Sequence, residues 1–380
     1  MKFQVNKDVL SEAVSFSVKL LPLRPALPVL NGVLVEANAT GVVLSTFDFE
    51  VSSRTTVVAT VEETGRVLIP GRLLNEIAGR LPQAPITVEL NDSRVVVTCG
   101  SSRFSLPCMS VDEYPTIPEV EGSTGMVKGD EFSTAISQVV VASSREDSMP
   151  VINGVQLEIS GTTLSMMATD RYRVAIKDVA WDPGSQPIDH SALVPSRTMQ
   201  EIGKTFGSSP TISITFATKD DREVIAFQAD NKTVTSLLIK GNFPPVRRLF
   251  PEVVENFAVV NTADLIEATR RVKLVVEREA ALKYIIRDNT ITLEAIGGDQ
   301  AQASETIDAV ISGLEPTVSL KPDLLLDGLT AVHSEFTRLG FNNGDNPSKP
   351  GPVLITSQTS KDGESESSFR YLLQPNLLLR

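Results

Sequence analysis

Two aspartates in matching surroundings are the side chains best placed for acid–base chemistry. Asp48 lies within Phe47-Asp48-Phe49, and Asp170 lies within Thr169-Asp170-Arg171, 122 residues later. A pair of carboxylates could serve as general acid and general base. A residue that recurs at equivalent places in one chain more often performs the same structural task in each, such as accepting turn amides. We therefore favour turn-forming aspartates over a catalytic pair.

Other motifs of catalysis or cofactor binding do not occur in the sequence. The only histidines, His190 and His333, lack the His, Cys or Glu spacing that could hold zinc, and both are expected at the surface. The sequence contains no Walker loop, no Gly-x-Gly-x-x-Gly between a strand and a helix, and no Gly-x-Ser-x-Gly elbow. We expect a non-catalytic protein with no metal and no cofactor.

Cysteine content and hydropathy bear on where the protein works. Cys99 and Cys108 are the only cysteines among 380 residues, which is too few for a disulfide framework. The amino terminus alternates like a strand and lacks the apolar core of a signal peptide, and no window reaches 18 uncharged apolar residues. The expected location is the cytoplasm, with no membrane contact.

Internal repetition organises the chain. The motif Leu-Pro-Val-Leu-Asn-Gly-Val at 27–33 recurs as Met-Pro-Val-Ile-Asn-Gly-Val at 149–155, and the same offset of 122 residues relates Leu10 to Phe132. A weaker third copy places Leu265 at a further offset of 133 residues from Phe132. Duplication of one unit is therefore the first hypothesis, and 380 residues suffice for three copies with their own cores.

Each copy is predicted to contain a helix, strands, a second helix and further strands, which gives an α+β fold with antiparallel sheets. Apolar residues recur at helical spacing near the start of each copy, and alternating β-rich runs follow. The predicted helices are 7–24, 71–81, 130–145, 197–206, 264–278 and 321–332. The predicted domains are 1–122, 123–252 and 253–380.

Charge is distributed unequally between the predicted helices and the rest of the chain. The net charge is −12, of which the six helices contribute +2 and the remainder −14. If all the helices shared one face, that face would approach DNA phosphates weakly and without reading sequence. The alternative is a set of scattered, solvated helix charges, and charge alone favours it.

Several stretches together resemble the bacterial DNA polymerase III beta subunit, the sliding-clamp family. The resemblance extends from end to end, because the stretches follow the family's order over a threefold repeat of the right size. They are Met1-Lys-Phe3, Arg24 to Leu30, Phe47-Asp48, Arg103 to Leu106, Ala168 to Arg173, Gly241 to Arg248 and Tyr371 to Pro375.

The resemblance implies three clamp domains per chain and a head-to-tail homodimer in which six domains form a ring. Such a ring encircles duplex DNA and tethers the replicative polymerase as its processivity factor. Helices would line the hole, with a weakly cationic surface. The residues expected to face DNA are Arg24, Arg72, Arg80, Arg197 and Lys204.

The resemblance also implies a hydrophobic pocket between the second and third domains that receives short peptides. The expected partners are the DNA polymerase III alpha subunit, clamp-loader subunits, other DNA polymerases and repair proteins. The pocket residues would be Ile152, Thr169, Tyr172, Arg173, Val174, Pro244, Arg248, Leu249, Leu372, Leu373, Gln374 and Pro375. From the residues alone, Ile152, Val174 and Leu372 could equally belong to a core.

The contact between subunits is expected to join the first domain of one chain to the third of the other. Ile77, Arg103, Phe104 and Leu106 would meet Leu274, Val275 and Glu305. The acidic set from Asp299 to Glu305 is thinner than in some members of the family, so we expect apolar burial to contribute more than ion pairs.

Three features depart from the family pattern. Gln374 stands where methionine is frequent in the family, and the chain continues as Leu377-Leu-Leu-Arg380. The resemblance therefore does not determine which peptide sequence the pocket prefers. The 145–150 loop lacks the tyrosines that some members of the family place near DNA.

Residues 343–367 are expected to form an exposed loop flanking one strand. A rival hypothesis for the whole chain is a repeat-built structural or ligand-binding protein that does not encircle DNA.

Overall fold

The computed structural model describes most of the chain, and every structural statement below concerns these residues. They are 1–22, 24–120, 124–146, 149–184, 189–219, 222–277, 280–297, 301–341 and 351–376. The chain forms two compact units, one comprising 1–133, 181–187 and 197–238 and the other 134–180, 188–196 and 239–380. The second repeat contributes strands to both units.

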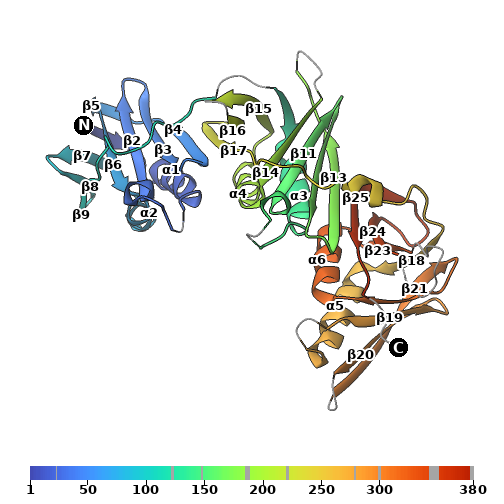
Figure 1. The fold of residues 1–380 in the computed structure, drawn as a ribbon. Helices are drawn as coiled ribbons and strands as arrows, with labels where there is room; N and C mark the ends of the chain where they lie inside the picture. The colour runs from blue at the N-terminus through green and yellow to red at the C-terminus, as the bar shows by residue number, and fades with distance from the viewer. Residues whose placement is uncertain are drawn as a thin grey trace. The chain divides into compact units, whose positions relative to one another are not determined.

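The first repeat has the predicted order of elements (Figure 1). Its helices are α1 (Lys7–Lys19) and α2 (Gly71–Arg80), with the short 3-10 helix η1 (Pro28–Asn31). The strands are β1 (Lys2–Val5), β2 (Gly32–Asn38), β3 (Gly41–Phe47), β4 (Val51–Val57), β5 (Thr60–Glu63), β6 (Gly65–Pro70), β7 (Ile86–Asn91), β8 (Arg94–Cys99) and β9 (Ser102–Pro107).

The second repeat follows the same order, with the single strand β14 (His190–Pro195) in the place of β5 and β6. It contains β10 (Gly125–Lys128), α3 (Gly129–Val140), η2 (Pro150–Ile152), β11 (Gly154–Ser160), β12 (Thr163–Thr169), β13 (Arg173–Ala180), β14 (His190–Pro195), α4 (Ser196–Phe206), β15 (Thr211–Lys219), β16 (Arg222–Ala229) and β17 (Lys232–Leu237). The linker to the third repeat carries η3 (Val246–Leu249).

The third repeat completes the pattern. It contains β18 (Asn256–Asn261), α5 (Thr262–Val272), η4 (Lys273–Val275), β19 (Leu282–Arg287), β20 (Thr290–Gly297), β21 (Ala301–Ser312), β22 (Thr317–Leu320), α6 (Pro322–Val332), β23 (Phe336–Phe341), β24 (Val353–Gln358) and β25 (Ser365–Leu373). All six predicted helices therefore form, and the prediction of an α+β fold is confirmed.

Three helices end five or six residues earlier than predicted, and α2 ends one residue earlier. α1 ends at Lys19 rather than at residue 24, and Pro22 follows it; proline lacks the N–H that a helix interior needs. α3 ends at Val140, where the Ser143 hydroxyl donates to the Val140 carbonyl (2.8 Å). α5 ends at Val272 and passes into η4. At the end of α3, the Ser143 hydroxyl thus bonds a carbonyl of the last helical turn.

Antiparallel sheets cross from one repeat into the next. In the first unit, an eight-stranded sheet has the order β10-β15-β16-β17-β4-β3-β2-β6, so β17 of the second repeat pairs with β4 of the first. In the second unit, a twelve-stranded sheet joins β13 to β25. A separate five-stranded sheet, β5-β1-β7-β8-β9, belongs to the first repeat alone.

Helices cover the inner face of the sheets with apolar side chains. In the first repeat, Leu10, Val14, Leu74 and Ile77 of α1 and α2 share a buried cluster with strand residues such as Val97. Asn6 caps the N-terminus of α1, because its side chain accepts a hydrogen bond from the backbone amide of Asp8 (2.9 Å). No helix in the described part of the chain is long and apolar enough to span a membrane.

Candidate functional site

The two matching aspartates hold turns rather than a catalytic centre. Asp48 Oδ1 accepts the backbone amides of Glu50 (3.0 Å) and Val51 (2.7 Å). Asp170 Oδ1 accepts those of Tyr172 (3.0 Å) and Arg173 (3.1 Å). Each carboxylate therefore closes the turn between two strands, and the predicted structural task is confirmed.

The residue after each aspartate adopts a left-handed backbone conformation. Phe49 has φ 74° and Arg171 has φ 80°. A positive φ strains a residue with a side chain, so the local hydrogen bonds must hold it in place. The turns of the first and second repeats are thus alike in backbone as well as in sequence.

Arg173 connects the second repeat to the third. Its Nε donates to Asp170 Oδ2 (2.9 Å), and its Nη1 donates to Asp327 Oδ2 (2.6 Å) and to the Tyr371 hydroxyl (3.2 Å). Burial disfavours the charged guanidinium, but Tyr371, Asp327 and Asp170 outweigh that effect and raise the pKa of Arg173. The Tyr371 hydroxyl in turn donates to the Leu324 carbonyl of α6 (2.7 Å).

Two predicted pocket residues, Val174 and Leu372, pack beneath the linker that joins these repeats. They face each other across β13 and β25 and share a buried cluster with Val246 of η3. Phe243 and Phe250 of the linker, both partly buried, pack against the same cluster. The cluster also contains Met167 and Ile176. Sequence reasoning missed Val246 and Phe243, although both lie in or beside the Phe-Pro-Pro-Val motif that supported the resemblance.

The remaining predicted pocket residues divide into a buried set and an exposed set. Thr169, Leu373, Pro375 and Ile152 are buried, and the Thr169 hydroxyl donates to the Arg173 carbonyl (2.7 Å). Pro244 is half-buried. The exposed residues are Tyr172, Arg248, Leu249 and Gln374. The backbone amide of Gln374 donates to the Tyr172 carbonyl (2.9 Å). The exposed set is therefore the part a peptide could reach directly.

A cavity of about 380 Å³ borders Tyr172 on the side of the third repeat. The Lys321 ammonium lies 5.4 Å from the centroid of the Tyr172 ring, which is a cation–π distance. Lys273 lines the cavity and pairs with Asp323 (2.7 Å). Tyr172 thus lines this cavity with its side chain and bonds Gln374 through its backbone carbonyl.

The five residues predicted to face DNA belong to one unit and are all exposed. Arg72 donates to the Pro22 carbonyl (2.9 Å), which ties α2 to the segment before Arg24. Arg80 lies 3.7 Å from Glu76, and Lys204 lies 2.9 Å from Glu201. Within the described ranges, Arg24 and Arg197 form no ion pair, so their charges are the most available.

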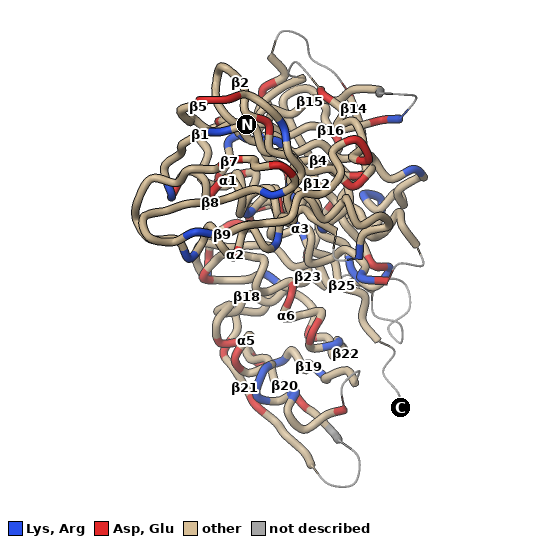
Figure 2. Tube along the Cα trace, turned by 90° about the vertical axis from the view of Figure 1, so that its left-hand side faces the viewer, with Lys and Arg blue, Asp and Glu red and all other residues tan. Residues whose placement is uncertain are grey.

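The helices that carry these residues lie on one side of the sheets of the first unit. α1, α2 and α4 are found together there (Figure 1), and the rings of Phe16 in α1 and Phe206 in α4 are 6.4 Å apart. Figure 2 shows that Lys and Arg are interspersed with Asp and Glu along the chain. The surface is therefore mixed in sign, and an attraction to phosphates would be weak.

Two strands have free edges that carry predicted interface residues. β9, with Arg103 and Phe104, pairs only with β8 among the described strands. β21 pairs with β18 through residues 309–312, but its residues 301–308 pair only with β20 in the described part of the chain. An unpaired edge offers backbone groups to another strand.

The equivalents of Phe104 in the other repeats are covered. Phe104 lies opposite Val97 in its sheet, as Val234 lies opposite Phe227 and Tyr371 opposite Ile355. Val234 and Tyr371 are 1% and 0% exposed, because β17 and β25 each pair with a neighbouring repeat, whereas Phe104 is 39% exposed. Phe104 therefore marks a junction that the single chain leaves open.

The other predicted interface residues differ in accessibility. Leu274 is 79% exposed, and Val275 is half-buried. Glu305 accepts hydrogen bonds from Arg271, which lower the pKa of Glu305. Ile77 and Leu106 pack in the core of the first repeat, so their side chains are not on its surface. Asp299 lies outside the described residues.

Several other sequence expectations concern short segments. His333 is exposed and His190 half-buried. No group of three His, Cys, Asp or Glu within the described ranges is arranged to hold a metal. Cys99 and Cys108 are free thiols. Residues 147–148, 343–350 and 377–380, and part of the expected first boundary at 121–123, lie outside the described residues.

Models of one protein family match most of the chain. The N-terminal domain of the DNA polymerase III beta subunit matches residues 1–118, the central domain matches 126–245, and the C-terminal domain matches 247–362. The three matches follow one another in the family's order.

Individual relatives agree with the family models. The chain is 38% identical over 376 residues to the beta sliding clamp of Streptomyces coelicolor, covering 99% of each. It is 44% identical over 307 residues to that of Micrococcus luteus, covering 81% of this chain and 98% of the relative.

Solved structures share the fold. The DNA polymerase sliding clamp from Bacillus subtilis has a TM-score of 0.89 at 24% identity, with 100% of each chain covered. A sliding clamp from Pseudomonas aeruginosa bound to griselimycin has a TM-score of 0.89 at 23% identity, also with 100% of each covered.

Proposed function

The chain belongs to the DNA polymerase III beta subunit family, and from that premise we propose how its edges, linkers and helices assemble and bind. The protein is a DNA sliding clamp, a non-catalytic processivity factor for DNA polymerase. Two copies close head to tail into a ring around duplex DNA. Because the ring is a topological link, the polymerase rebinds at high local concentration without any base-specific contact.

The observation that carries this proposal is the pair of free strand edges. Inside one chain, the last strand of a repeat pairs with the β4-type strand of the repeat before it, first through β17 and β4 and then through β25 and β13. Three repeats leave one last strand, β9, and one β4-type strand, β21, without such a partner among the described strands. Two chains joined head to tail pair both of these edges in each chain.

The two internal junctions also define a register for the contact between chains. Lys232 faces Thr55 in one junction, and Phe369 faces Lys177 in the other. Thr55, Lys177 and Glu305 are equivalent, since they lie opposite Leu44, Met166 and Leu293 in their hairpins. By the same pairing rule, Ser102 of one chain faces Glu305 of the other, and Phe104 faces Ala303.

Partner peptides dock on the junction of the second and third repeats. Tyr172 and Leu249 are exposed at its rim, above the apolar cluster that contains Val174 and Leu372. Apolar walls with a few polar groups suit an anchored peptide. The partners are the DNA polymerase III alpha subunit, clamp-loader subunits, other DNA polymerases and repair proteins. A sliding clamp from Pseudomonas aeruginosa binds griselimycin, and we propose that this junction is where the present protein would bind it.

DNA passes along the helices through weak contacts with Arg24, Arg72, Arg80, Arg197 and Lys204. Arg24 and Arg197 contribute most, because the described residues offer neither of them an ion-pair partner, whereas Glu76 and Glu201 neutralise part of the charge of Arg80 and Lys204. Weak phosphate contacts permit sliding, while tight ones would stop it.

A topological assay tests the proposed function. The clamp loader and ATP are used to place the protein on nicked circular DNA, and the complex is separated by gel filtration. Linearising the DNA with a restriction enzyme should release the protein, while an uncut sample retains it. Equal retention on linear and circular DNA would mean ordinary binding and would overturn the ring.

A further inference from the structure

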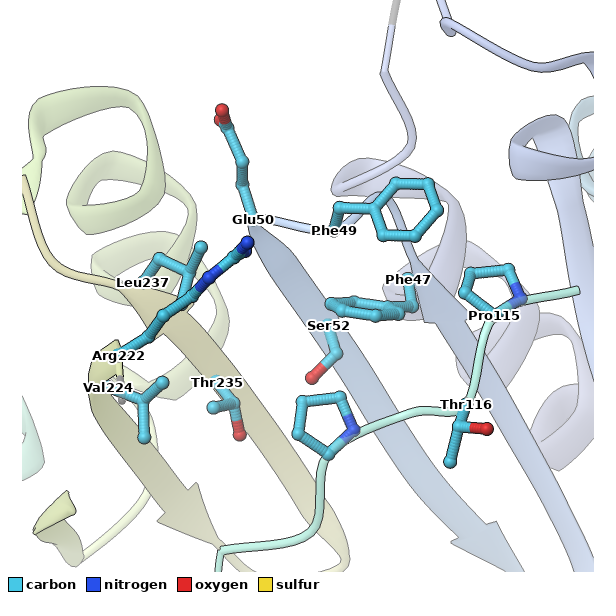
Figure 3. A pocket seen from close by; sticks show the side chains of 11 residues that line it. Phe47, Phe49, Glu50, Ser52, Pro115, Thr116, Arg222, Val224, Thr235 and Leu237 are labelled. Carbon is cyan, nitrogen blue, oxygen red and sulfur yellow. The ribbon is translucent and has the colours of Figure 1, made fainter. Parts of the chain in front are cut away.

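A cavity of about 360 Å³ lies at the junction of the first and second repeats (Figure 3). It shares no residue with the junction between the second and third repeats. Its lining comes from β3 and β4, from β16 and β17, and from the linker between the repeats. The residues on which the argument rests are Phe47, Ser52, Pro115, Val224, Thr235 and Leu237.

Two hydroxyl-bearing residues line this cavity, and neither hydroxyl group has a protein partner among the described residues. Ser52 and Thr235 face each other across β4 and β17 and are 4% and 5% exposed. Neither side chain forms a hydrogen bond with any residue in the described part of the chain. Buried hydroxyl groups are normally hydrogen-bonded. An occupant that displaces water from the cavity must therefore supply the partners of these two groups.

The walls around the hydroxyl groups are mainly aromatic and apolar, and the charged side chains of Glu50 and Arg222 also line the cavity. The rings of Phe47 and Phe49 are 5.7 Å apart and tilted by 55°, and Figure 3 shows Pro115 beside Phe47. Leu237 lies on the opposite wall, with the Arg222 side chain extended across it (Figure 3). The cavity thus combines flat apolar walls, which suit an aromatic ring, with a polar pair at its base.

The same elements build the junction between the second and third repeats. Ser52 and Thr235 correspond in register to Val174 and Leu372, which face each other at the other junction. The linkers match as well, since Tyr114-Pro115 corresponds to Phe243-Pro244. The first junction differs in that two hydroxyl groups replace two apolar side chains.

We propose that this cavity is a second peptide-docking site, which takes an extended segment of a partner protein anchored by a tyrosine. The tyrosine ring packs against Phe47 and Pro115, and its phenol group exchanges hydrogen bonds with Ser52 and Thr235. A phenylalanine would leave both hydroxyl groups without partners, so the site discriminates between the two residues. The peptide class rests on the proposed function of the other junction, whereas the preference for a phenol rests on this cavity alone.

The test uses the full-length dimer with labelled valine and leucine methyl groups. N-acetyl-tyrosinamide and N-acetyl-phenylalaninamide are titrated separately, and the methyl resonances of Val224 and Leu237 are followed by NMR. The tyrosine compound is expected to shift both resonances and to bind at least several-fold more tightly. Griselimycin is titrated in parallel, with Val174 and Leu372 as reporters. Shifts at one junction without the other separate this proposal from the proposed function.

Two variants complete the test. Ser52→Ala combined with Thr235→Val keeps the cavity volume and removes both hydroxyl groups, so it should abolish the preference for the tyrosine compound. Phe49→Ala changes an exposed wall residue and should weaken both compounds equally. The proposal is overturned if the reporters do not shift at millimolar concentration, if the two compounds bind equally well, or if the preference survives in the double variant.

Discussion

Val174 of β13 faces Leu372 of β25, and this pairing joins the second repeat to the third in one continuous sheet. The two side chains are buried beneath Val246, so they form the floor of the proposed peptide site rather than its rim. Substitutions at the floor would disturb the sheet and so lower the stability of the protein. Substitutions at the rim can change the affinity for a ligand while the stability stays the same.

Replacing both rim residues, by Tyr172→Ala and Leu249→Ala, should weaken griselimycin binding by tenfold or more. Each side chain is about half exposed, so the substitutions leave the core unchanged and the melting temperature should stay close to that of the parent. Isothermal titration calorimetry measures the affinity, and calorimetric unfolding measures stability. Phe49→Ala is the matched control, because it removes an exposed aromatic side chain at the other junction. Unchanged affinity in the double variant would place the ligand elsewhere.

Phe104→Arg should convert the dimer into monomers. The substitution places a charge where the equivalents Val234 and Tyr371 are covered by a neighbouring repeat, and an unpaired buried charge opposes association. Light scattering should report 41.0 kDa instead of twice that mass. Val58→Arg is the control, since Val58 is exposed and lies outside the two free edges. A dimer that persists in the Phe104 variant would remove Phe104 from the interface.

The proposed register is tested by a disulfide between chains. In a background with Cys99→Ala and Cys108→Ala, the pair Ser102→Cys and Glu305→Cys should form a covalent dimer under mild oxidation. Directly opposed residues of antiparallel strands have Cβ atoms about 4.5–5.5 Å apart, near the range that a disulfide requires. The pair Ser102→Cys and Ala303→Cys shifts the partner by two residues and should cross-link poorly. Efficient cross-linking of the shifted pair alone would refute the register.

Tyr114 should make the linker sensitive to alkaline pH. Its hydroxyl accepts the Phe47 amide (2.7 Å), and burial raises the pKa of Tyr114 to about 12. An unfolded tyrosine titrates near pH 10, so the stabilisation by Tyr114 is complete below pH 10 and is lost as the pH rises toward 12. Tyr114→Phe leaves the Phe47 amide without this partner and should cost about 1–3 kcal/mol at pH 8.

Urea unfolding at pH 8 and pH 11 measures the effect of Tyr114. The difference between the parent and Tyr114→Phe should narrow at the higher pH, because the parent loses its stabilisation there. The other buried tyrosines, Tyr284 and Tyr371, are present in both proteins and cancel in the difference. A difference that is independent of pH would exclude the phenol of Tyr114 as its source.

The order of elements could be predicted from sequence, because apolar spacing and turn residues are local signals. Asp48 and Asp170 identified equivalent turns in this way, and their hydrogen bonds confirm it. Helix ends were less accurate, since Pro22 follows α1 and cannot continue a helix, and Ser143 bonds the carbonyl at the end of α3. The pairing of β17 with β4 and of β25 with β13 could not be predicted, because strand partners far apart in sequence leave no local pattern.

For the candidate site too, local sequence patterns were informative and contacts between distant residues could not be predicted. The resemblance identified Val174 and Leu372, but it did not separate the floor of the junction from its rim, which depends on where the linker packs. Arg173 illustrates the difficulty, because its partners Asp327 and Tyr371 lie 154 and 198 residues away in the sequence. Ser52 and Thr235 carry no sequence signal, since each is an ordinary strand residue until the cavity is formed.

The proposed ring contains two kinds of junction between repeats: those that a linker of the chain crosses and those that it does not. At each internal junction the chain itself crosses over, with Tyr114 packed among Leu30 and Leu68 at one and with Val246 over Leu372 at the other. The proposed junction between β9 and β21 joins two different chains, so no linker crosses it. A ring of six repeats therefore has four junctions that a linker crosses and two that depend on strand edges and nearby side chains alone. We expect such a ring to open first at one of those two junctions, so a clamp loader would need to recognise the protein but not the place where it opens.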